Sequence, residues 1–569
     1  MPNTLGLHHL HCLHRVHLRT CWALFTGLSL GACGGGGGGS GPASTVTPPP
    51  PATYTVGGTV TGLAGSGLVL NSVFGGDLAV SASGSFTFGT PLPDGSEYNV
   101  GVGNQPTSSP AQYCQVANGT GTIAAANVMN VTVTCGTGYT VGGTVSGLVG
   151  SGLTLAICHQ VSPHGGRPPP PTCHSLLQVG ANGAFTLDSD YPAGYSGFDF
   201  VSVTQQPSSP PQRCVLSNAA VSIQTANDTS VVVSCAAYSY VTNAADNTLS
   251  SYSVDATTGA LAAVGMPTAT GTTPYAIVGL DTGAGKRYVY VGNEGSNDVS
   301  AFAVDNTTGA LTAVPGSPFP AGTDPKAMAL CGGVQSLCIA NAGSHNVSVY
   351  TIDYSTGALT ALPGSPVAVG KSPTSIVFFN GNVFVANHGG SNDISAFYNN
   401  GGMPGDGTAV PGSPFPAGGN PLSLALGAGG KFLYTANPDA SRSSISGFSV
   451  DLGGPLTPLS GPPFPIPVSN YIATDQTGAY LYVTSGTNIV GYAIDATTGA
   501  LTELPGFPVA SGVNAYSITI DPGNQFLYVA NDGAANVTGF RLDASTGALT
   551  PMAGSPFPAG NHPQFIATF

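Results

Sequence analysis

The sequence predicts an all-β protein with two small sandwich modules followed by a larger ring of β-sheets. Three observations support this prediction. Only three glutamates and four lysines stand beside 83 glycines and 47 prolines, so strong helix formers are scarce. The run that begins at Tyr54 recurs 85 positions later at Tyr139. After residue 237, a unit of 46 to 50 residues is repeated until the chain ends.

The repeated unit is clearest in residues 525–558, QFLYVANDGAANVTGFRLDASTGALTPMAGSPFP. A period of about 40 to 50 residues with several short strands per copy indicates propeller blades rather than a helical repeat. The copies are aligned by one position, which is occupied in chain order by Asn243, Asn293, Asn341, Asn387, Asn437, Ser485 and Asn531. Seven copies predict a seven-bladed β-propeller over residues 238–569.

Each copy contains a wholly apolar run, such as residues 526–530, which predicts a strand buried on both faces. A second strand follows, and then a turn of the form D-x-x-T-G, in which aspartate accepts backbone hydrogen bonds and glycine supplies a positive φ. The first copy starts at Tyr238 without the short apolar strand that opens the others, and a spare one lies at residues 563–569. We therefore expect the terminal segment to complete the first blade and close the ring.

Residues 1–33 predict an export signal. Arg15 and Arg19 precede an apolar run, residues 21–30, that is too short to span a bilayer. The Leu-Gly-Ala-Cys sequence that follows resembles the lipobox of bacterial lipoproteins, which implies that Cys33 is acylated and anchors the chain in a membrane. The alternative is an ordinary cleaved signal peptide.

Residues 34–53 contain six consecutive glycines and a proline-rich stretch, which predict a flexible tether. Gly34 is not an aspartate, so by analogy with lipoprotein sorting we expect an outer-membrane or cell-surface location. Without the predicted signal, nine basic residues face 25 acidic ones, a net charge of −16. Phosphate backbones would repel such a chain, which argues against nucleic-acid binding.

Residues 54–135 and 139–235 predict two Ig-like β-sandwich modules. Both begin with the run YTVGGTV and end in a short strand, VTVTC or VVVSC. Arrays of such modules usually act as stalks or adhesive spacers. Eight cysteines follow the leader, and this even number indicates disulfides and an oxidising compartment.

Cysteine spacing predicts one disulfide in each module and a third across a turn within one blade. The last two cysteines lie in an insertion of the second module, where two Cys-His dipeptides and His164 could alternatively bind zinc. A disulfide is the preferred interpretation, because of the compartment and because the spacing matches no known zinc finger. The predicted pairs are Cys114–Cys135, Cys158–Cys173, Cys214–Cys235 and Cys331–Cys338.

The segment 240–243 reads YVTN, and later copies carry the variants FLYVAN and YLYVTS. With these repeats, residues 238–569 resemble the YVTN or lactonase-type seven-bladed β-propellers. The resemblance implies the fold and, as an expectation, hydrolysis of a lactone of the 6-phosphogluconolactonase type at the central channel. One propeller fold hosts many activities, so the expectation about activity depends on the site.

Propellers of this kind usually bind ligands at the channel mouth, where the innermost strands start. The aligned mouth positions form a mostly small and neutral ring, namely Thr273, Asp324, Ser372, Asn420, Val468, Asn514 and His562. The His562-Pro563 pair resembles a feature of lactonase-type sequences, and a lactone hydrolase needs a group that activates water. His562 and Asp324 are therefore weak catalytic candidates, and a structural role for the histidine is the alternative.

Other polar residues of the propeller receive no catalytic role from the pattern. His345 and His388 follow YVTN-like strands and are expected to be structural, and nothing in the pattern places Arg287 or Glu294 in the channel. We find no phosphate loop, G-x-S-x-G elbow, H-E-x-x-H motif or calcium loop, so no cofactor or metal is predicted.

The scarcity of catalytic residue types favours a binding function. We expect a cell-envelope lipoprotein whose propeller, carried on an Ig-like stalk, binds a surface glycan or a protein partner. The alternatives are a lactonase-like hydrolase and a structural surface-layer component. A charged channel mouth would favour the enzyme, and a neutral mouth the binding protein.

Overall fold

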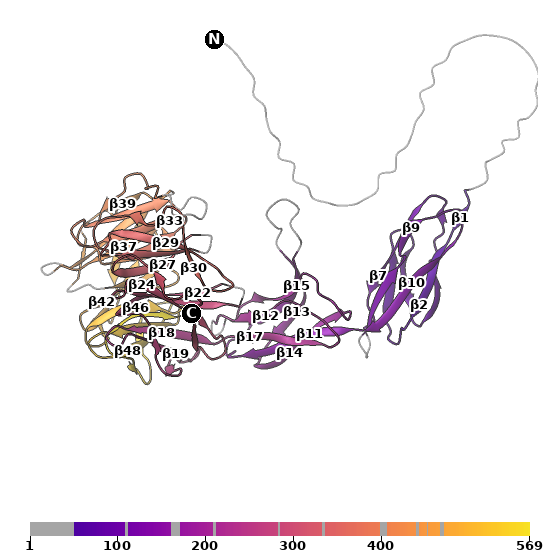
Figure 1. Ribbon diagram of the computed structural model, residues 1–569, viewed down its shortest axis with the longest axis horizontal. Coiled ribbons are helices and arrows are strands. Elements are labelled where there is room, and N and C mark those ends of the chain that lie inside the picture. The colour runs from indigo at the N-terminus through magenta and orange to yellow at the C-terminus, as the bar shows by residue number, and fades with distance from the viewer. Residues whose placement is uncertain are drawn as a thin grey trace, which may run out of the picture. The chain divides into compact units, whose positions relative to one another are not determined.

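The computed structural model is built almost entirely from β-strands (Figure 1). It describes residues 51–107, 112–160, 171–208, 212–282, 285–332, 336–398, 407–439, 443–451, 453–461, 463–466 and 471–568. The predicted signal peptide with Cys33, and the predicted tether up to residue 50, lie outside the described residues. In the described part of the chain, no helix is long and apolar enough to cross a membrane.

The first module consists of two four-stranded sheets that share one apolar core, which includes Val56, Leu68, Leu70, Val131 and Val133. One sheet contains β5 (Gly84–Thr87), β2 (Val56–Thr61), β10 (Val128–Thr137) and β8 (Gln112–Ala117). The other contains β4 (Gly76–Val80), β3 (Leu68–Ser72), β7 (Glu97–Asn104) and β9 (Thr120–Thr122). A separate two-stranded sheet consists of β1 (Thr53–Tyr54) and β6 (Leu92–Pro93).

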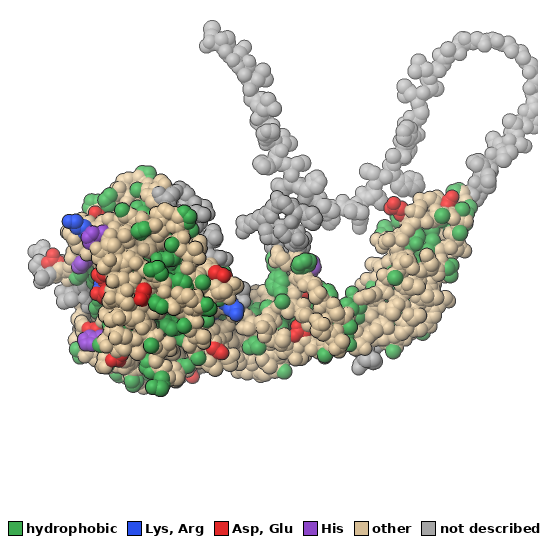
Figure 2. All heavy atoms as spheres, in the orientation of Figure 1, with side chains coloured by type: hydrophobic (Ala, Val, Ile, Leu, Met, Phe, Trp, Pro, Cys, Tyr) green, Lys and Arg blue, Asp and Glu red, His purple; other side chains and the backbone are tan. Residues whose placement is uncertain are grey.

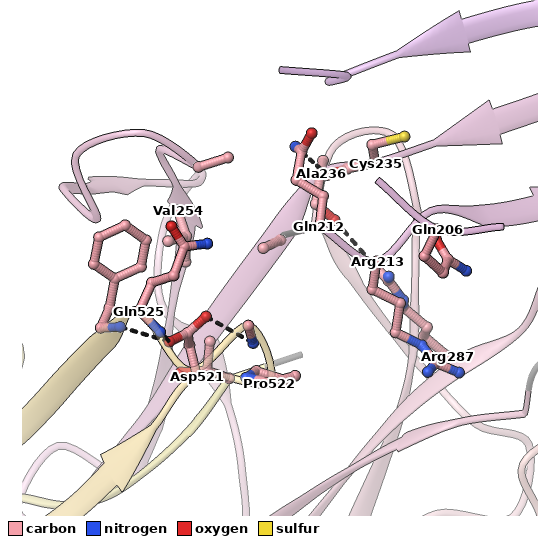
Figure 3. A pocket seen from close by; sticks show the side chains of 15 residues that line it. Gln206, Gln212, Arg213, Cys235, Ala236, Val254, Arg287, Asp521, Pro522 and Gln525 are labelled. Atoms are coloured by element: carbon pink, nitrogen blue, oxygen red, sulfur yellow. Dashed lines mark hydrogen bonds between the residues drawn. The ribbon is translucent and has the colours of Figure 1, made fainter. Parts of the chain in front are cut away.

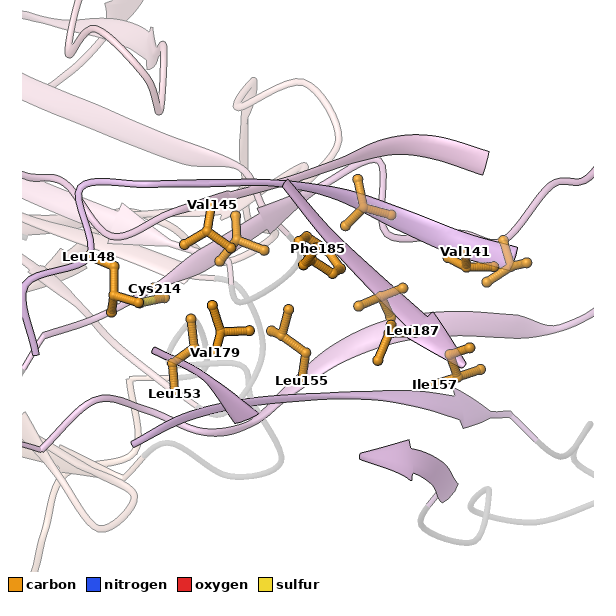
Figure 4. Packing of buried hydrophobic residues seen from close by; sticks show 14 of the residues in the cluster. Val141, Val145, Leu148, Leu153, Leu155, Ile157, Val179, Phe185, Leu187 and Cys214 are labelled. Atoms are coloured by element: carbon orange, nitrogen blue, oxygen red, sulfur yellow. The ribbon is translucent and has the colours of Figure 1, made fainter. Parts of the chain in front are cut away.

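The second module repeats this plan around its own core, in which Val141, Leu155 and Leu187 are fully buried (Figure 4). One sheet contains β14 (Gly183–Tyr191), β11 (Tyr139–Ser146), β17 (Asp228–Ser234) and β16 (Val215–Ser217). The other contains β13 (Thr172–Val179), β12 (Leu153–His159) and β15 (Asp199–Gln205). Each of the two predicted modules thus has an apolar core of its own, and their division into Ig-like domains stays a prediction.

The shared YTVGGTV run has a steric reason. Strand β2 pairs in parallel with β10, and β11 pairs in parallel with β17. A Cβ atom on Gly58 would lie 1.7 Å from the carbonyl oxygen of Val131, and one on Gly143 would lie 1.7 Å from that of Val231. Only glycine allows the two backbones to approach this closely.

All four predicted disulfides are present, namely Cys114–Cys135, Cys158–Cys173, Cys214–Cys235 and Cys331–Cys338. The second of them joins β12 to β13, where the two cysteines face each other in register. Both thiols of the alternative zinc site are therefore consumed, whereas His164 lies outside the described residues.

Among the described residues, the propeller contains seven sheets, each with an inner strand next to the channel. The inner strands are, from the first blade to the seventh, β51 (Pro563–Thr568), β22 (Pro274–Asp281), β27 (Pro325–Leu330), β32 (Pro373–Phe379), β36 (Ser423–Gly427), β41 (Ile472–Thr474) and β46 (Ala515–Ile520). The second strands are β18 (Ala237–Asn243), β23 (Arg287–Asn293), β28 (Ser336–Asn341), β33 (Asn382–Asn387), β37 (Phe432–Asn437), β42 (Tyr480–Ser485) and β47 (Phe526–Asn531).

The third strands lie outside these and carry short outer strands. They are β19 (Thr248–Val254), β24 (Asp298–Val304), β29 (Asn346–Ile352), β34 (Asp393–Tyr398), β38 (Ser444–Val450), β43 (Asn488–Ile494) and β48 (Asn536–Leu542). Their three-residue partners are β20 (Leu261–Ala263), β25 (Leu311–Ala313), β30 (Leu359–Ala361), β39 (Leu456–Pro458), β44 (Leu501–Glu503) and β49 (Leu549–Pro551). Their two-residue partners are β21 (Thr268–Ala269), β26 (Phe319–Pro320), β31 (Val367–Ala368), β35 (Phe415–Pro416), β40 (Phe464–Pro465), β45 (Val509–Ala510) and β50 (Phe557–Pro558). One 3-10 turn, η2 (Ala428–Gly430), precedes β37.

The ring closes as predicted. Strand β51 pairs antiparallel with β18, with Ser239 opposite Thr568 and Val241 opposite Ile566. The last described residues of the chain thus supply the inner strand of the first blade. Closure leaves neither end of the ring with an open sheet edge.

Buried tyrosines connect five of the seven blades to the next one. Burial of the second strands on both faces places their tyrosine hydroxyls beside the glycine of the neighbouring D-x-x-T-G turn. The hydroxyl donates to the glycine carbonyl oxygen at 2.7 to 2.9 Å in five pairs, namely Tyr240–Gly309, Tyr290–Gly357, Tyr434–Gly499, Tyr482–Gly547 and Tyr528–Gly259. The last pair spans the closure between the seventh blade and the first.

The asparagine of the YVTN signature has a structural role. In the first blade, Asn243 is fully buried, and its Nδ2 donates to Thr248 Oγ1 at 3.1 Å and Ser250 Oγ at 2.9 Å. Asn531 makes the equivalent bonds to Asn536 Oδ1 and Thr538 Oγ1 in the seventh blade. The amide therefore fixes the loop between the second and third strands of its blade, at the mouth end of the ring.

Candidate functional site

The central channel holds a cavity of about 180 Å³ that the inner strands of the blades enclose. Its wall is mixed: Ile277, Met328 and Phe565 are apolar, whereas Lys326 and Ser517 are polar. Charged and histidine side chains lie along one edge of the propeller in Figure 2. The polar groups that could act on a ligand are concentrated at the end of the channel where the inner strands begin.

The predicted mouth positions share a backbone conformation. Five of them have positive φ, namely Thr273, Asp324, Ser372, Asn514 and His562. The carbonyl oxygen of each accepts the N–H of the residue that follows the YVTN-position asparagine, at distances from 2.8 to 3.1 Å, from Glu294, Ala342, His388, Asp532 and Ala244 respectively. These two loops of each blade are thereby held together at the mouth. Val468 lies outside the described residues, and Asn420 is described without this conformation.

Two of the mouth histidines have structural roles, as expected. His345 Nδ1 lies 3.1 Å from the backbone nitrogen of Ser372 in the next blade and 2.8 Å from the carbonyl oxygen of Ala342. His388 Nε2 accepts from Asn420 Nδ2 at 3.1 Å. Burial lowers the pKa of His388, which keeps its ring neutral.

His562 differs from both, because it forms a histidine–carboxylate pair. Its Nδ1 lies 3.0 Å from Asp532 Oδ1, and its side chain is 60% exposed. Asp532 is itself fixed by Gln564 Nε2, which donates at 2.6 Å, and by Asn514 Nδ2, which donates at 2.7 Å. The carboxylate orients the imidazole through Nδ1 and leaves Nε2 as the atom that can exchange a proton with a ligand or water.

Asp324 is part of a second charged cluster, with Lys326 and Glu294. The Lys326 Nζ lies 2.7 Å from Glu294 Oε2 and 3.5 Å from Asp324 Oδ1. It also lies 4.2 Å from the centroid of the Tyr275 ring. Burial raises the pKa of Asp324. The positive charge of Lys326 acts in the opposite direction, and the like charge of Glu294 adds to the rise.

Three tyrosines from different blades meet between these two charged groups. The Tyr275 hydroxyl is 2.7 Å from that of Tyr471 and forms a short hydrogen bond with that of Tyr516. The Phe565 ring packs on all three, with centroid distances of 5.0 to 6.1 Å. Burial raises the pKa of Tyr275 and Tyr471 far above the ordinary value, so their hydroxyls stay protonated.

These contacts connect the two charged groups across the mouth. Lys326 sits on the Tyr275 ring, Tyr275 contacts Phe565, and the neighbouring Gln564 binds Asp532. The aromatic cluster, which we call the aromatic floor, therefore contacts the ammonium–carboxylate cluster through Tyr275 and adjoins the histidine–carboxylate pair through the neighbouring residues 564 and 565. Such a floor can hold a small ring-shaped ligand between a proton acceptor and hydrogen-bond donors.

The structure corrects the predicted composition of the mouth. Asp324 and His562 both lie there, on the third and first blades, but each has its own partner. Glu294, which the pattern did not place in the channel, lies at the mouth beside Lys326. The mouth is therefore charged rather than mostly neutral. Lys326 stands two positions after Asp324. Side chains two positions apart lie on the same face of a strand, and this spacing could have identified Lys326 as a residue of the mouth.

A larger cavity, about 240 Å³, lies where the second module meets the propeller (Figure 3). The fully buried Arg287 lines it, so this residue serves the module contact rather than the channel. Other polar side chains that line this cavity are bonded within the chain. Arg213 Nε donates to Asp281 at 2.8 Å, and Asp521 accepts from the backbone nitrogens of residues 523, 525 and 526. We therefore place the candidate site at the mouth.

Comparison with known families agrees with this fold. A family model described as "Lactonase, 7-bladed beta-propeller" matches residues 202–322, 238–378 and 470–565. The propeller of this chain therefore matches the model of the lactonase-type seven-bladed β-propellers over these residues. No relative is found among curated proteins.

Solved structures are similar over the propeller. A protein from Lactobacillus plantarum is 18% identical, with a TM-score of 0.50, and the match covers 59% of this chain and 99% of that one. A putative 6-phosphogluconolactonase from Bacteroides uniformis is 19% identical, with the same coverages and a TM-score of 0.49. The periplasmic gluconolactonase of Pseudomonas aeruginosa is 16% identical, with coverages of 58% and 99% and a TM-score of 0.46. At 18% identity the Lactobacillus likeness supports the fold alone.

Proposed function

We propose that the propeller hydrolyses small lactones at the channel mouth. The observation that carries this proposal is the pairing of the exposed His562 with Asp532 at 3.0 Å, at the end of the channel where the inner strands begin. A charged mouth favours an enzyme over a binding protein, and the mouth of this propeller carries Lys326, Glu294, Asp324 and Asp532. The family match to lactonase-type propellers supports the same choice.

The proposed reaction assigns a role to each group. A water molecule attacks the acyl carbon of the lactone, and His562 Nε2 takes the proton that this water loses. The ring C–O bond then breaks, and the same proton passes to the leaving oxygen, so that the product is a hydroxy acid. The developing negative charge on the carbonyl oxygen is stabilised by the Tyr516 hydroxyl.

Asp532 is a positioning residue in this scheme. It holds the imidazole through Nδ1 and stabilises the imidazolium that forms when Nε2 takes a proton. Gln564 and Asn514 donate to this carboxylate from neighbouring inner strands, so the orientation of the base depends on the closed ring. A carboxylate fixed by two amide donors needs little reorganisation during the reaction.

The test is proton release from a panel of lactones, followed by pH-stat. The purified protein is compared with His562→Ala and with His174→Ala, which removes an exposed histidine of the second module. We expect His562→Ala to lower kcat by about 10²- to 10⁴-fold, the usual worth of a general base, and His174→Ala to have no effect. Equal rates in all three proteins, or no turnover at all, would contradict the proposal.

We also propose that the chain is an envelope protein anchored by an acyl group on Cys33, on the outer membrane or the cell surface. The four disulfides support an extracytoplasmic location. Binding of a surface glycan is the second candidate function of the mouth. The observation that favours it is the pair of half-buried rings of Tyr516 and Phe565, since aromatic rings commonly line ligand pockets.

A further inference from the structure

We propose that the mouth selects neutral, polyhydroxylated lactones and discriminates against phosphorylated ones. This inference rests on the proposed lactone hydrolysis and adds the substrate class. The inference follows from the charge balance of the mouth. A phosphate group on the substrate would have to come close to the ionisable side chains of the mouth, and most of these are acidic. A phosphate group needs cationic or N–H partners that are free to approach it.

The mouth cation is already committed. Lys326 has 21% of its side chain exposed, and its ammonium contacts Glu294 at 2.7 Å and Asp324 at 3.5 Å. The Tyr275 ring covers a further side at 4.2 Å. Two carboxylates around one ammonium leave this cluster with a net charge of −1 when all three groups are ionised. A phosphate that reached the lysine would have to displace a carboxylate.

The histidine–carboxylate pair adds a further acidic side chain. Asp532 lies beside His562, and its carboxylate is 16% exposed. Other described ionisable residues of the mouth loops are mostly acidic too, namely Asp246, Asp298, Asp393 and Asp439 against Lys371. Arg442 lies outside the described residues. The described mouth therefore presents a negative potential to an approaching anion.

The same groups suit hydroxyl-rich neutral ligands. The carboxylates of Glu294 and Asp532 are 32% and 16% exposed, so each has acceptor capacity for a ligand hydroxyl. The half-buried rings of Tyr516 and Phe565 offer an apolar face between them. A pocket with an apolar floor and a few convergent polar groups is the usual form of a small-molecule site. A lactone that carries several hydroxyls and no charge matches it.

The experiment compares initial rates on three probes: D-glucono-1,5-lactone, its 6-phosphate, and the apolar γ-nonalactone. Rates are measured at about 20 mM and about 200 mM salt, where screening differs strongly. We expect kcat/KM to be at least about tenfold higher for the neutral sugar lactone than for its phosphate at low salt. The ratio should fall at high salt, and γ-nonalactone should be the slower of the two neutral lactones.

A charge variant tests the cause. Glu294→Gln removes one negative charge with little change in size, and it should raise kcat/KM for the phosphate relative to the neutral lactone by about 3- to 10-fold. Glu503→Gln, an exposed carboxylate on the outer strand β44, is the matched control and should leave that ratio unchanged. Equal or faster turnover of the phosphate, or an unchanged ratio in Glu294→Gln, overturns the substrate class alone. Absence of turnover on all three probes overturns the proposed hydrolysis itself.

Discussion

Tyr528→Phe tests whether the ring is held together by hydrogen bonds between blades. The Tyr528 hydroxyl donates to the carbonyl oxygen of Gly259 at 2.7 Å, and the bond is buried. Phenylalanine fills the same space, so the substitution removes one hydroxyl and leaves the glycine carbonyl without this donor. We expect the free energy of unfolding to fall by about 1–2 kcal/mol, the usual cost of such a change.

A second tyrosine in the same ring provides the matched control. Tyr480 donates to the carbonyl oxygen of Ser545 in the next blade, also at 2.7 Å, but that bond is exposed. Water replaces an exposed partner, so Tyr480→Phe should cost less than about 0.5 kcal/mol. Both substitutions remove the same atom, and burial is the difference between them.

The measurement is equilibrium unfolding in urea at pH 7, with the slope m held as a check on compactness. Burial raises the pKa of Tyr528 far above its ordinary value, so the hydroxyl donates throughout the neutral range and the cost should not change between pH 6 and pH 9. A cost below about 0.5 kcal/mol for Tyr528→Phe, or equal costs for both variants, would refute the reasoning.

Three further predictions address the turns, the closure and the anchor. In the D-x-x-T-G turns, backbone N–H groups of Thr258 and Thr308 hold the pKa of Asp255 and Asp305 below the ordinary value, so this stabilisation is present above about pH 4 and is lost as the pH falls through the folded-state pKa. Changing both aspartates to asparagine should therefore reduce the loss of stability between pH 5 and pH 2, by about 0.3–0.5 kcal/mol per site at these exposed positions. The measurement is urea unfolding at both pH values. If the free energies of unfolding at pH 5 and pH 2 differed as much in the variant as in the unchanged protein, the prediction would be wrong. Deletion of residues 561–569 removes β51 and should abolish cooperative unfolding and lower solubility, and an unchanged melting curve would argue against closure. Cys33→Ser should move the protein from the membrane fraction to the soluble envelope fraction, because acyl chains supply about 0.8 kcal/mol per buried CH₂, whereas continued membrane retention would indicate another anchor.

The repeats made the fold predictable. A seven-fold period specifies the number of blades, and the unpaired strand at each end of the array specifies the closure that β51 and β18 form. The even number of cysteines, their spacing and the predicted oxidising compartment indicated the four disulfides that are present. These features are local in sequence or repeated, so they can be read without knowing which strands become neighbours.

The site was harder to predict, because its groups converge from separate blades. Lys326 and Glu294 are 32 positions apart and meet only through the ring. Asp532 directly follows the YVTN-like strand of the seventh blade, and its partner His562 precedes the inner strand of the first blade, 30 positions later. The residue at the aligned mouth position varies among the seven copies, so the repeat pattern does not predict which side chains form the site. Tyr275, Tyr471 and Tyr516 occupy comparable strand starts in three blades, and that recurrence was the available sign of an aromatic floor.

The closure of the first blade also sets an order of events during synthesis. Ser239 bonds Thr568, a partner 329 positions later, so β18 waits with one edge unpaired while six other blades are made. A chain that stops early keeps that edge exposed and has neither β51 nor His562. Only a chain that reaches residue 568 can both pair the free edge of β18 and supply His562, the base of the proposed site.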